Sequence, residues 1–251
     1  MRIAVIDCGT NTFNLLIGDK TEKGFQTVFA DKISVKIGKG GIHNALMTSD
    51  AMDRAYLALE THKEKIEHYN ADKIRVIATS AFRSASNAHE LTDRVKSELN
   101  LDIEIISGEQ EAKFIYQGVM QSGALDAEDS LIMDVGGGSC EFIIANKERA
   151  GAFFSFDTGV SRLIEMFKPS DPIQPEQIDE MYNYISSVIQ PLLAASQNYE
   201  IHHLVGSSGT FDTFADMIFF ETGHQLKQEL TLSYDLNDFF EIYYTIIHST
   251  L

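Results

Sequence analysis

The chain has 251 residues and a formal net charge of −17, with 37 acidic residues against 20 basic ones. This balance argues against general nucleic-acid binding, which needs a basic face, and an anionic substrate would need a local basic patch and a divalent cation. No apolar run approaches the roughly 20 residues that span a bilayer, and the N-terminus shows no signal-peptide pattern. The length suits two medium-sized domains.

The cysteine content favours a reducing compartment. Cys8 and Cys140 are the only cysteines, which fits a cytoplasmic location. We expect each to be a small core residue, because free cysteines are usually buried; a redox pair is the alternative.

The first half of the chain alternates strand and helix patterns. A Thr-Ser-Asp triplet at 48–50 precedes apolar residues at helical spacing and predicts a helix start. The predicted elements are a hairpin with arms 3–7 and 13–18, a strand over 25–37, a helix from 48–50 to about 68, a strand over 73–79, a helix from 86 or 87 to about 99, a strand over 102–107 and a helix over 108–121.

Three charged residues in this half are candidates for chemistry. Arg83 is predicted to lie in a polar loop after a strand, where its guanidinium can donate two hydrogen bonds to phosphate; a surface ion pair is the alternative. Glu109 and Glu111 fall in the first turn of a predicted helix. Either is a candidate general base for water, although carboxylates at a helix start also complement the helix dipole without any function.

The second half repeats the alternation after a turn-like segment near residues 122–130. Proline at 169, 172 and 175 predicts a rigid connection, and Pro191 predicts a break in a long helix. The predicted elements are a hairpin over 131–145, a strand over 149–157, a helix from 158–162 to 167, a helix over 176–197, strands over 202–205 and 231–233, and a helix over 235–249.

The hairpin over 131–145 contains the sequence DVGGGS. Glycines allow a sharp turn whose successive N–H groups form a concave nest for phosphate, and Asp134 is well placed to hold a hydrated divalent cation. A tight turn without function explains such a motif equally well on its own. The same pattern occurs near the N-terminus, 127 residues earlier, with Asp7 matching Asp134 and Asn14 matching Glu141. This repeat predicts two related lobes whose hairpins grip a phosphate chain and its metal.

A third glycine loop follows the predicted strand 202–205. The sequence GSSGT, which contains Gly206, Ser207, Ser208 and Gly209, leads from this strand into a helix. The free N–H groups at a helix start bind anions well, so the loop is a candidate phosphate site; a plain strand-to-helix turn is the alternative. The whole pattern predicts an α/β protein of mixed sheets with flanking helices.

Together these motifs resemble a known family. The hairpins and the GSSGT loop are similar to the phosphate and adenosine motifs of the actin, sugar-kinase and heat-shock-chaperone superfamily. More narrowly, the chain resembles the exopolyphosphatase and guanosine pentaphosphate phosphohydrolase family. The resemblance lies in four segments, VIATSAFRSASN, ISGEQEAKFIYQGV, DVGGGSCEF and DTGVSRLIEMF. The chain looks like a short form without the HD-type C-terminal domain, and it stops before the closing helical segment of other short members.

The resemblance implies a fold and an activity. It implies two actin-like (ribonuclease H-like) lobes, residues 1–124 and 125–251, with the active site in the cleft between them. The implied enzyme is a Mg²⁺-dependent hydrolase without an organic cofactor. Its implied substrates are inorganic polyphosphate and guanosine penta- or tetraphosphate, its implied state is a homodimer, and neither nucleic acid nor membrane is an implied partner.

The resemblance also implies roles for individual residues. Glu111 would be the base for the attacking water, Arg83 would bind substrate phosphate, and Asp134 and Glu141 would bind Mg²⁺, with Asp7 as their counterpart in the first hairpin. Phosphate oxygens would be held by the turn residues Asn11, Thr12, Gly136, Gly137, Gly138 and Ser139. Two positions depart from the family pattern: Gln110 replaces a second glutamate, and Cys140 replaces a threonine.

Two other functions remain open at this level. An ATP-dependent kinase of the same superfamily would need an acceptor pocket with its own catalytic aspartate, which the sequence does not place. A non-catalytic sensor of polyphosphate or of guanosine phosphates would be favoured by loss of Glu111 or Asp134, and both residues are present.

Overall fold

The computed structural model describes residues 1–22, 24–41, 44–222 and 231–250, and the chain divides into two compact units. Unit 1 comprises Met1–Gly108, Gly136–Ser139 and Gly159–Met166; unit 2 comprises Glu109–Val135, Cys140–Thr158 and the chain from Phe167 onward. The predicted lobes met at residues 124 and 125. The observed units instead place residues 109–124 in unit 2 and two short segments of the second half in unit 1.

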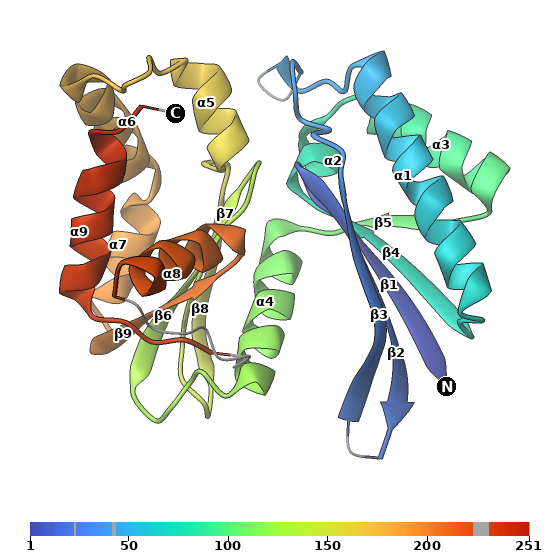
Figure 1. The fold of residues 1–251 in the computed structure, drawn as a ribbon, viewed down its shortest axis with the longest axis horizontal. Coiled ribbons are helices and arrows are strands. Elements are labelled where there is room, and N and C mark those ends of the chain that lie inside the picture. Colours follow the sequence, from blue (N-terminus) through green and yellow to red (C-terminus); the bar gives the residue numbers. More distant parts are fainter. Residues whose placement is uncertain (23, 42–43, 223–230, 251) are drawn as a thin grey trace. The chain divides into compact units, whose positions relative to one another are not determined.

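Unit 1 is built on a five-stranded mixed sheet with the strand order β3-β2-β1-β4-β5 (Figure 1). Strands β1, β2 and β3 are antiparallel, and β4 and β5 continue the sheet in parallel with β1. The strands are β1 (Arg2–Cys8), β2 (Thr12–Thr21), β3 (Gly24–Ser34), β4 (Lys73–Ala78) and β5 (Ile103–Ile105). The predicted strands 25–37 and 102–107 are therefore real but shorter at their C-terminal ends.

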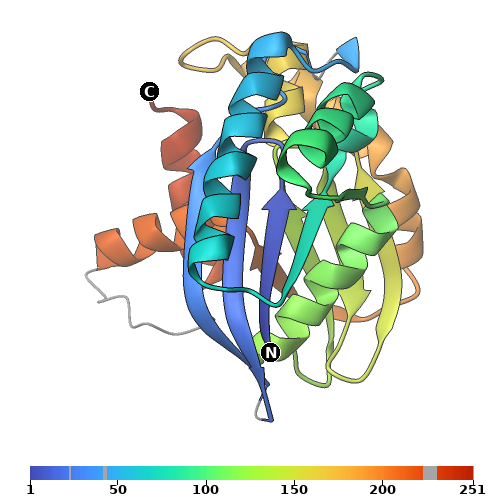
Figure 2. The same ribbon diagram turned by 90° about the vertical axis from the view of Figure 1, so that its right-hand side faces the viewer.

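The helices of unit 1 follow from capping and from burial of one face. Helix α1 begins after Thr48, whose side chain accepts a 3.3 Å hydrogen bond from the N–H of Ala51, as the sequence predicts. Its apolar side packs with β1 and β2 in one buried cluster that also includes α3, and Figure 2 shows α1 and α3 in front of the sheet. The helices are α1 (Ser49–His68), α2 (Ser80–Ser84), α3 (Ala88–Leu99) and α5 (Val160–Phe167).

The predicted loop around Arg83 is wrong, because Arg83 lies in the short helix α2. The N–H of Arg83 donates to the carbonyl of Thr79 at 3.0 Å, closing a helical turn. Burial explains why so short a helix forms. Phe82 is 1% exposed and lies beside the ring of Phe13, so the turn is held by the core rather than by its own length.

Unit 2 is built on a four-stranded mixed sheet with the order β8-β7-β6-β9. Strands β6, β7 and β8 are antiparallel, and β9 is parallel to β6. This is the order of β3-β2-β1-β4, so the two halves repeat one topology, as the sequence repeat predicts. The strands are β6 (Asp129–Val135), β7 (Cys140–Ala145), β8 (Ala150–Phe156) and β9 (Ile201–Ser207).

Both faces of the unit 2 sheet are covered. Every residue of β7 is buried, with Ile143 packed against Ala112 of α4 on one face and Ile144 against Leu192 of α7 on the other. The long predicted helix does break before Pro191, between α6 and α7. The helices are α4 (Gly108–Ser122), α6 (Pro175–Val188), α7 (Gln190–Ser196), α8 (Gly209–Thr222) and α9 (Leu236–Ile247).

Two further expectations are settled by the structure. The predicted strand 231–233 is wrong: these residues are exposed and pair with no strand in the described part of the chain, because a β-branched residue alone does not create a strand. Cys8 and Cys140 are both buried thiols outside any disulfide, and they lie in separate apolar clusters, which confirms them as core residues. Within the described ranges, no helix has the length and apolar character that crossing a membrane requires.

Candidate active site

The two hairpins share one turn geometry. In the first, the N–H of Gly9 donates to the carbonyl of Thr12 at 3.0 Å; in the second, the N–H of Gly136 donates to the carbonyl of Ser139 at 3.0 Å. The acidic residues also correspond, because Asp7 lies directly opposite Asn14 and Asp134 directly opposite Glu141. The sequence repeat is therefore a repeat of backbone hydrogen bonding and side-chain pairing.

The turn Gly136–Ser139 points its carbonyl groups at the start of α5, within unit 1. The carbonyl of Gly136 accepts from the N–H of Val160 at 3.0 Å, and the carbonyl of Gly137 accepts from the N–H of Ser161 at 2.8 Å. The C=O and N–H groups that flank one peptide bond point in opposite directions. The N–H groups of residues 137 and 138 therefore face away from α5, which is the orientation that an anion nest requires.

The same turn lies against the first hairpin and α2. A Cβ atom on Gly137 would stand 2.8 Å from Nδ2 of Asn11, and one on Gly138 would stand 2.6 Å from the hydroxyl oxygens of Thr10 and Ser80. No other residue fits either position without displacing these side chains. In addition, Oδ1 of Asn11 accepts a 2.9 Å hydrogen bond from the Ser161 hydroxyl. The structure thus brings Asn11, Gly137 and Gly138 together, as predicted.

Arg83 joins this group through α2, the helix that also carries Ser80. Its guanidinium is half-buried, and Nη1 donates to the carbonyl of Ile106 at 3.1 Å. This bond uses one of the five guanidinium donors. Thr12 opens β2, and its carbonyl closes the first turn.

Asp7 lies at the end of β1, where its side chain reaches solvent. Surrounding protein atoms still remove water from its carboxyl group, and this partial desolvation raises its pKa above the ordinary value. The amide of Asn14, which donates a 3.2 Å hydrogen bond to Oδ2, acts in the opposite direction. Asp7 is thus a solvent-accessible carboxyl group that ionises less readily than a fully hydrated one.

Unit 2 carries a row of oxygen-bearing side chains across its sheet. Asp134 lies opposite Glu141 on β7 and beside Ser207 on β9, and Glu141 lies opposite Ser155 on β8. Opposed residues of neighbouring strands project from the same face. Glu141 is 1% exposed and accepts a 2.7 Å hydrogen bond from the Ser155 hydroxyl, whereas Asp134 is half-buried.

Helix α4 covers the face of the sheet that bears this row. Ala112 packs with Ile132 and Ile143, which share a face with Asp134 and Glu141 because alternate strand residues do. The 15 residues of α4 and the seven residues of β6 both span about 22 Å. Since the link between them, residues 123–128, is short, α4 runs back along β6, and the start of α4 lies at the end of unit 2 where β6 ends (Figure 1). Asp134 is the penultimate residue of β6.

The two glutamates at the start of α4 differ in environment. Glu109 is exposed and accepts a 2.5 Å hydrogen bond from the ammonium of Lys113, which lowers the pKa of Glu109. Glu111 is half-buried and directly precedes Ala112, whose side chain packs against the sheet. Of the two candidate bases, Glu111 is therefore the less exposed.

The GSSGT loop begins at the end of β9 and leads into α8, as predicted. The Ser208 hydroxyl lies 3.3 Å from both the N–H and the carbonyl of Val135, which fixes the loop beside the end of β6. Gly206 has a packing role, because a Cβ there would stand 2.1 Å from the ring of Phe211. Part of this glycine signature thus reflects packing under an aromatic ring.

The structure also contains features that the sequence reasoning missed. Arg162, which the sequence places only in a helix start, contacts the glycine turn, and Ser155 supports Glu141. At the other end of β6, His203 forms an exposed cluster with Asp126 and Glu128, the single group of three such ligand-type side chains found close together in the described residues. Its Nε2 lies 3.1 Å from Oε2 of Glu128, within hydrogen-bonding distance.

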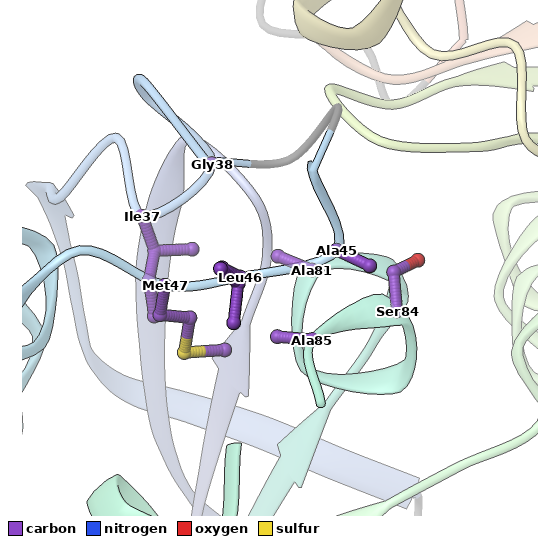
Figure 3. A pocket seen from close by; sticks show the side chains of 8 residues that line it. All are labelled: Ile37, Gly38, Ala45, Leu46, Met47, Ala81, Ser84 and Ala85. Atoms are coloured by element: carbon purple, nitrogen blue, oxygen red, sulfur yellow. The ribbon is translucent and has the colours of Figure 1, made fainter. Parts of the chain in front are cut away.

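One hollow in unit 1 is not a substrate site. Figure 3 shows it beside α2, where it has no room for a water molecule. Ser84 contributes the only polar side chain among its lining residues, which are Ile37, Gly38, Ala45, Leu46, Met47, Ala81, Ser84 and Ala85.

The repeated sheets and glycine-turn hairpins define an actin-like α/β fold. The sequence model of the Ppx/GppA phosphatase family matches residues 16–243, and the chain belongs to this family. It is similar to an exopolyphosphatase from Cytophaga hutchinsonii, with 40% identity, a TM-score of 0.95, and coverage of 100% of this chain and 81% of that one.

Two further solved structures resemble the chain. An exopolyphosphatase-like protein is 28% identical with a TM-score of 0.78, covering 87% of this chain and 69% of that one. The PPX-GPPA enzyme of Aquifex aeolicus is 23% identical with a TM-score of 0.75, covering 100% and 82%, and supports the fold alone.

Proposed function

We propose that the protein is a Mg²⁺-dependent hydrolase that releases terminal phosphate from inorganic polyphosphate, guanosine pentaphosphate or both. The observation that carries the proposal is the glycine turn of the second hairpin, which presents N–H groups as an anion nest and ends the strand that bears Asp134. Phosphoryl transfer demands mainly positioning and stabilisation of charge, and these groups supply both.

Phosphate binding is the role of the unit 1 residues. The N–H groups of Gly137 and Gly138 would donate to phosphate oxygens, with the amide of Asn11 and the hydroxyls of Thr12 and Ser139 as further ligands. Arg83 would add a charge-assisted, two-pronged contact. In unit 2, the loop Gly206–Gly209 would bind phosphate at the start of α8.

The unit 2 carboxylates suit Mg²⁺, which takes oxygen ligands and usually keeps several waters. The row of Ser207, Asp134, Glu141 and Ser155 is an all-oxygen donor set on one face of the sheet. Asp134, being half-buried, would contact the hydrated ion directly, and the buried Glu141 would accept from its waters. Asp7 would be a further ligand. When bound, the ion would neutralise charge on the transferred phosphoryl group.

Glu111 would act as general base for the attacking water. Three features support this role: its partial burial, its place on the helix that covers the carboxylate row, and the family pattern. Replacing Glu111 by Gln keeps its shape and removes the proton acceptor. We expect Mg²⁺-dependent phosphate release to fall by about 10²–10⁴-fold.

The structure offers a matched control in the same helical turn. Glu109→Gln changes an exposed carboxylate that pairs with Lys113, and it should alter phosphate release less than about 3-fold, because exposed ion pairs contribute little. Both variants and the wild type would be assayed on polyphosphate and guanosine pentaphosphate, with and without a chelator. Equal rates for Glu111→Gln and wild type would contradict the proposal, as would transfer of phosphate from ATP to an acceptor without release.

The name of the Cytophaga relative favours polyphosphate over guanosine pentaphosphate as the substrate of this chain. We therefore expect the larger kcat/KM with polyphosphate. A homodimer, which the family resemblance implies, would be tested by light scattering on the purified protein.

A further inference from the structure

The side chain of Arg162 on α5 connects three parts of unit 1. Its Nε donates to the carbonyl of Gly138 at 3.1 Å, and its Nη2 donates to the hydroxyl of Ser84 at 2.9 Å. Arg162 therefore ties the glycine turn to α2, the short helix that carries Arg83. These two bonds end on protein atoms, so through them Arg162 would act on a ligand by way of the turn.

The turn needs this side chain because the backbone of α5 anchors only part of it. The N–H groups of Val160, Ser161 and Arg162 all donate to the carbonyls of Gly136 and Gly137. The third carbonyl, that of Gly138, is instead held by the guanidinium of Arg162. All three carbonyls then point away from the nest, and each turns the N–H group of the following residue into it.

We infer that Arg162 is a positioning residue that keeps the Gly138–Ser139 peptide oriented for anion binding. The expected effect of Arg162 on phosphate release rests on the proposed function, whereas its expected effect on anion binding does not. A glycine has little intrinsic preference for one peptide orientation, so a freed Gly138 carbonyl can rotate toward the nest. A carbonyl oxygen there would replace a donor with an acceptor and repel phosphate oxygens.

The side chains packed around Gly138 enclose it but do not fix the direction of its carbonyl group. The Ser80 hydroxyl is buried, has no hydrogen-bond partner in the described part of the chain and lies against Gly138, so the turn is enclosed on the α2 side without being bonded there. Arg162 thus supplies the directional contact that α2 packing does not. Its loss should change the ligand affinity of the nest more than the stability of unit 1.

The test compares three variants with the wild type. Arg162→Met removes both hydrogen bonds while keeping an unbranched apolar stem; Arg162→Lys keeps the charge and one donor group; Ser84→Ala removes the α2 partner while leaving the bond to Gly138. Calorimetry would measure the binding of tripolyphosphate in the presence of Mg²⁺. Steady-state assays would give kcat and KM for phosphate release, and thermal melting would report folding.

We expect Arg162→Met to weaken tripolyphosphate binding and raise KM by about 10-fold or more, with a smaller change in kcat, since the contact acts on the ground state and transition state alike. Arg162→Lys should recover part of the affinity, and Ser84→Ala should stay within about 3-fold of wild type. If Arg162→Met fails to fold, the other two variants still test the positioning role, because tripolyphosphate binding should weaken more in Arg162→Lys than in Ser84→Ala.

The outcomes separate this inference from the proposed function. One outcome is a wild type that binds tripolyphosphate without releasing phosphate while the Arg162 variants bind it more weakly. That result would contradict the hydrolase proposal and support the positioning role. Unchanged tripolyphosphate binding in Arg162→Met or in Arg162→Lys, or an equal loss in Ser84→Ala, would overturn the positioning role. Absence of binding by the folded wild type would overturn both.

Discussion

Glycine occupies positions 137 and 138 because neighbouring side chains leave no room for a Cβ. Asn11 faces the first position, and Thr10 and Ser80 face the second. The sequence pattern of three glycines already indicated a tight turn with exposed N–H groups. It did not reveal that the turn is enclosed by residues from elsewhere in unit 1, because those contacts join segments far apart in the chain.

Replacing Gly138 by Ala tests this enclosure. The new Cβ would stand 2.6 Å from two hydroxyl oxygens, so the turn or its neighbours must shift. We expect about 1–3 kcal/mol of destabilisation, as for overpacking, and a larger relative loss of phosphate release because the nest is displaced. Urea unfolding and the phosphate assay measure the two effects.

Gly118→Ala is the matched control for that substitution. Gly118 lies inside α4 with open space where a Cβ would stand. Alanine should stabilise the helix by about 0.4–1 kcal/mol and leave activity unchanged. Similar losses in both variants would show that the enclosure of Gly138 has no special importance.

At the scale of elements, prediction from sequence succeeded where the cause is local. The start of α1 follows from the Thr48 side chain, and the hairpins follow from adjacent apolar runs and glycine turns. It failed where packing decides: α2 forms because Phe82 is buried, and residues 231–233 find no partner strand among the described residues. The candidate site shows the same division, since the hairpin residues are proposed from their motif, whereas Arg162 bonds to a carbonyl 24 positions earlier.

Helix α1 carries a buried histidine that links its packing to pH. His62 is fully buried against β2, with Nε2 3.2 Å from the carbonyl of Phe13 and Nδ1 3.6 Å from the carboxylate of Asp31. Burial lowers the pKa of His62; the Phe13 carbonyl and Asp31 oppose this shift, and Lys65 adds to it. Lys65 also pairs with Asp31 and lowers the pKa of Asp31, which stays ionised near neutral pH.

The lowered pKa fixes the sign of the pH dependence. In the unfolded chain, His62 takes up a proton below about pH 6.5, whereas the folded chain does so only at lower pH. The unfolded state therefore binds more protons in this window, and the free energy of unfolding should decrease as pH falls, by at most about 1.4 kcal/mol per pH unit. Above pH 6.5 this contribution should be constant.

Urea unfolding of wild type and His62→Gln at pH 7.5 and 6.0 measures this contribution. The wild type should lose more stability than the variant between the two values. The exposed His89 provides the control, because His89→Gln should retain the wild-type slope. A wild-type slope that survives in His62→Gln would assign the pH dependence to other groups.

The whole molecule presents a conflict between its charge and its proposed substrate. A net charge of −17 repels a polyphosphate at long range, whereas the proposed phosphate ligands, the glycine turn and Arg83, would attract it only at contact. Salt screens the long-range part first, because the Debye length falls from about 30 Å at 0.01 M to about 10 Å at 0.1 M. The repulsion should slow the encounter with substrate but leave the bound complex largely unaffected.

Raising the NaCl concentration from about 0.01 to 0.1 M at constant free Mg²⁺ should therefore increase kcat/KM for polyphosphate, while kcat changes little. An enzyme whose encounter is steered by a basic surface shows the opposite trend, a steady fall with salt. Keeping free Mg²⁺ fixed matters, since the ion itself neutralises part of the substrate charge. A steady fall in kcat/KM would mean that attraction near the glycine nest outweighs the acidic surface even at long range.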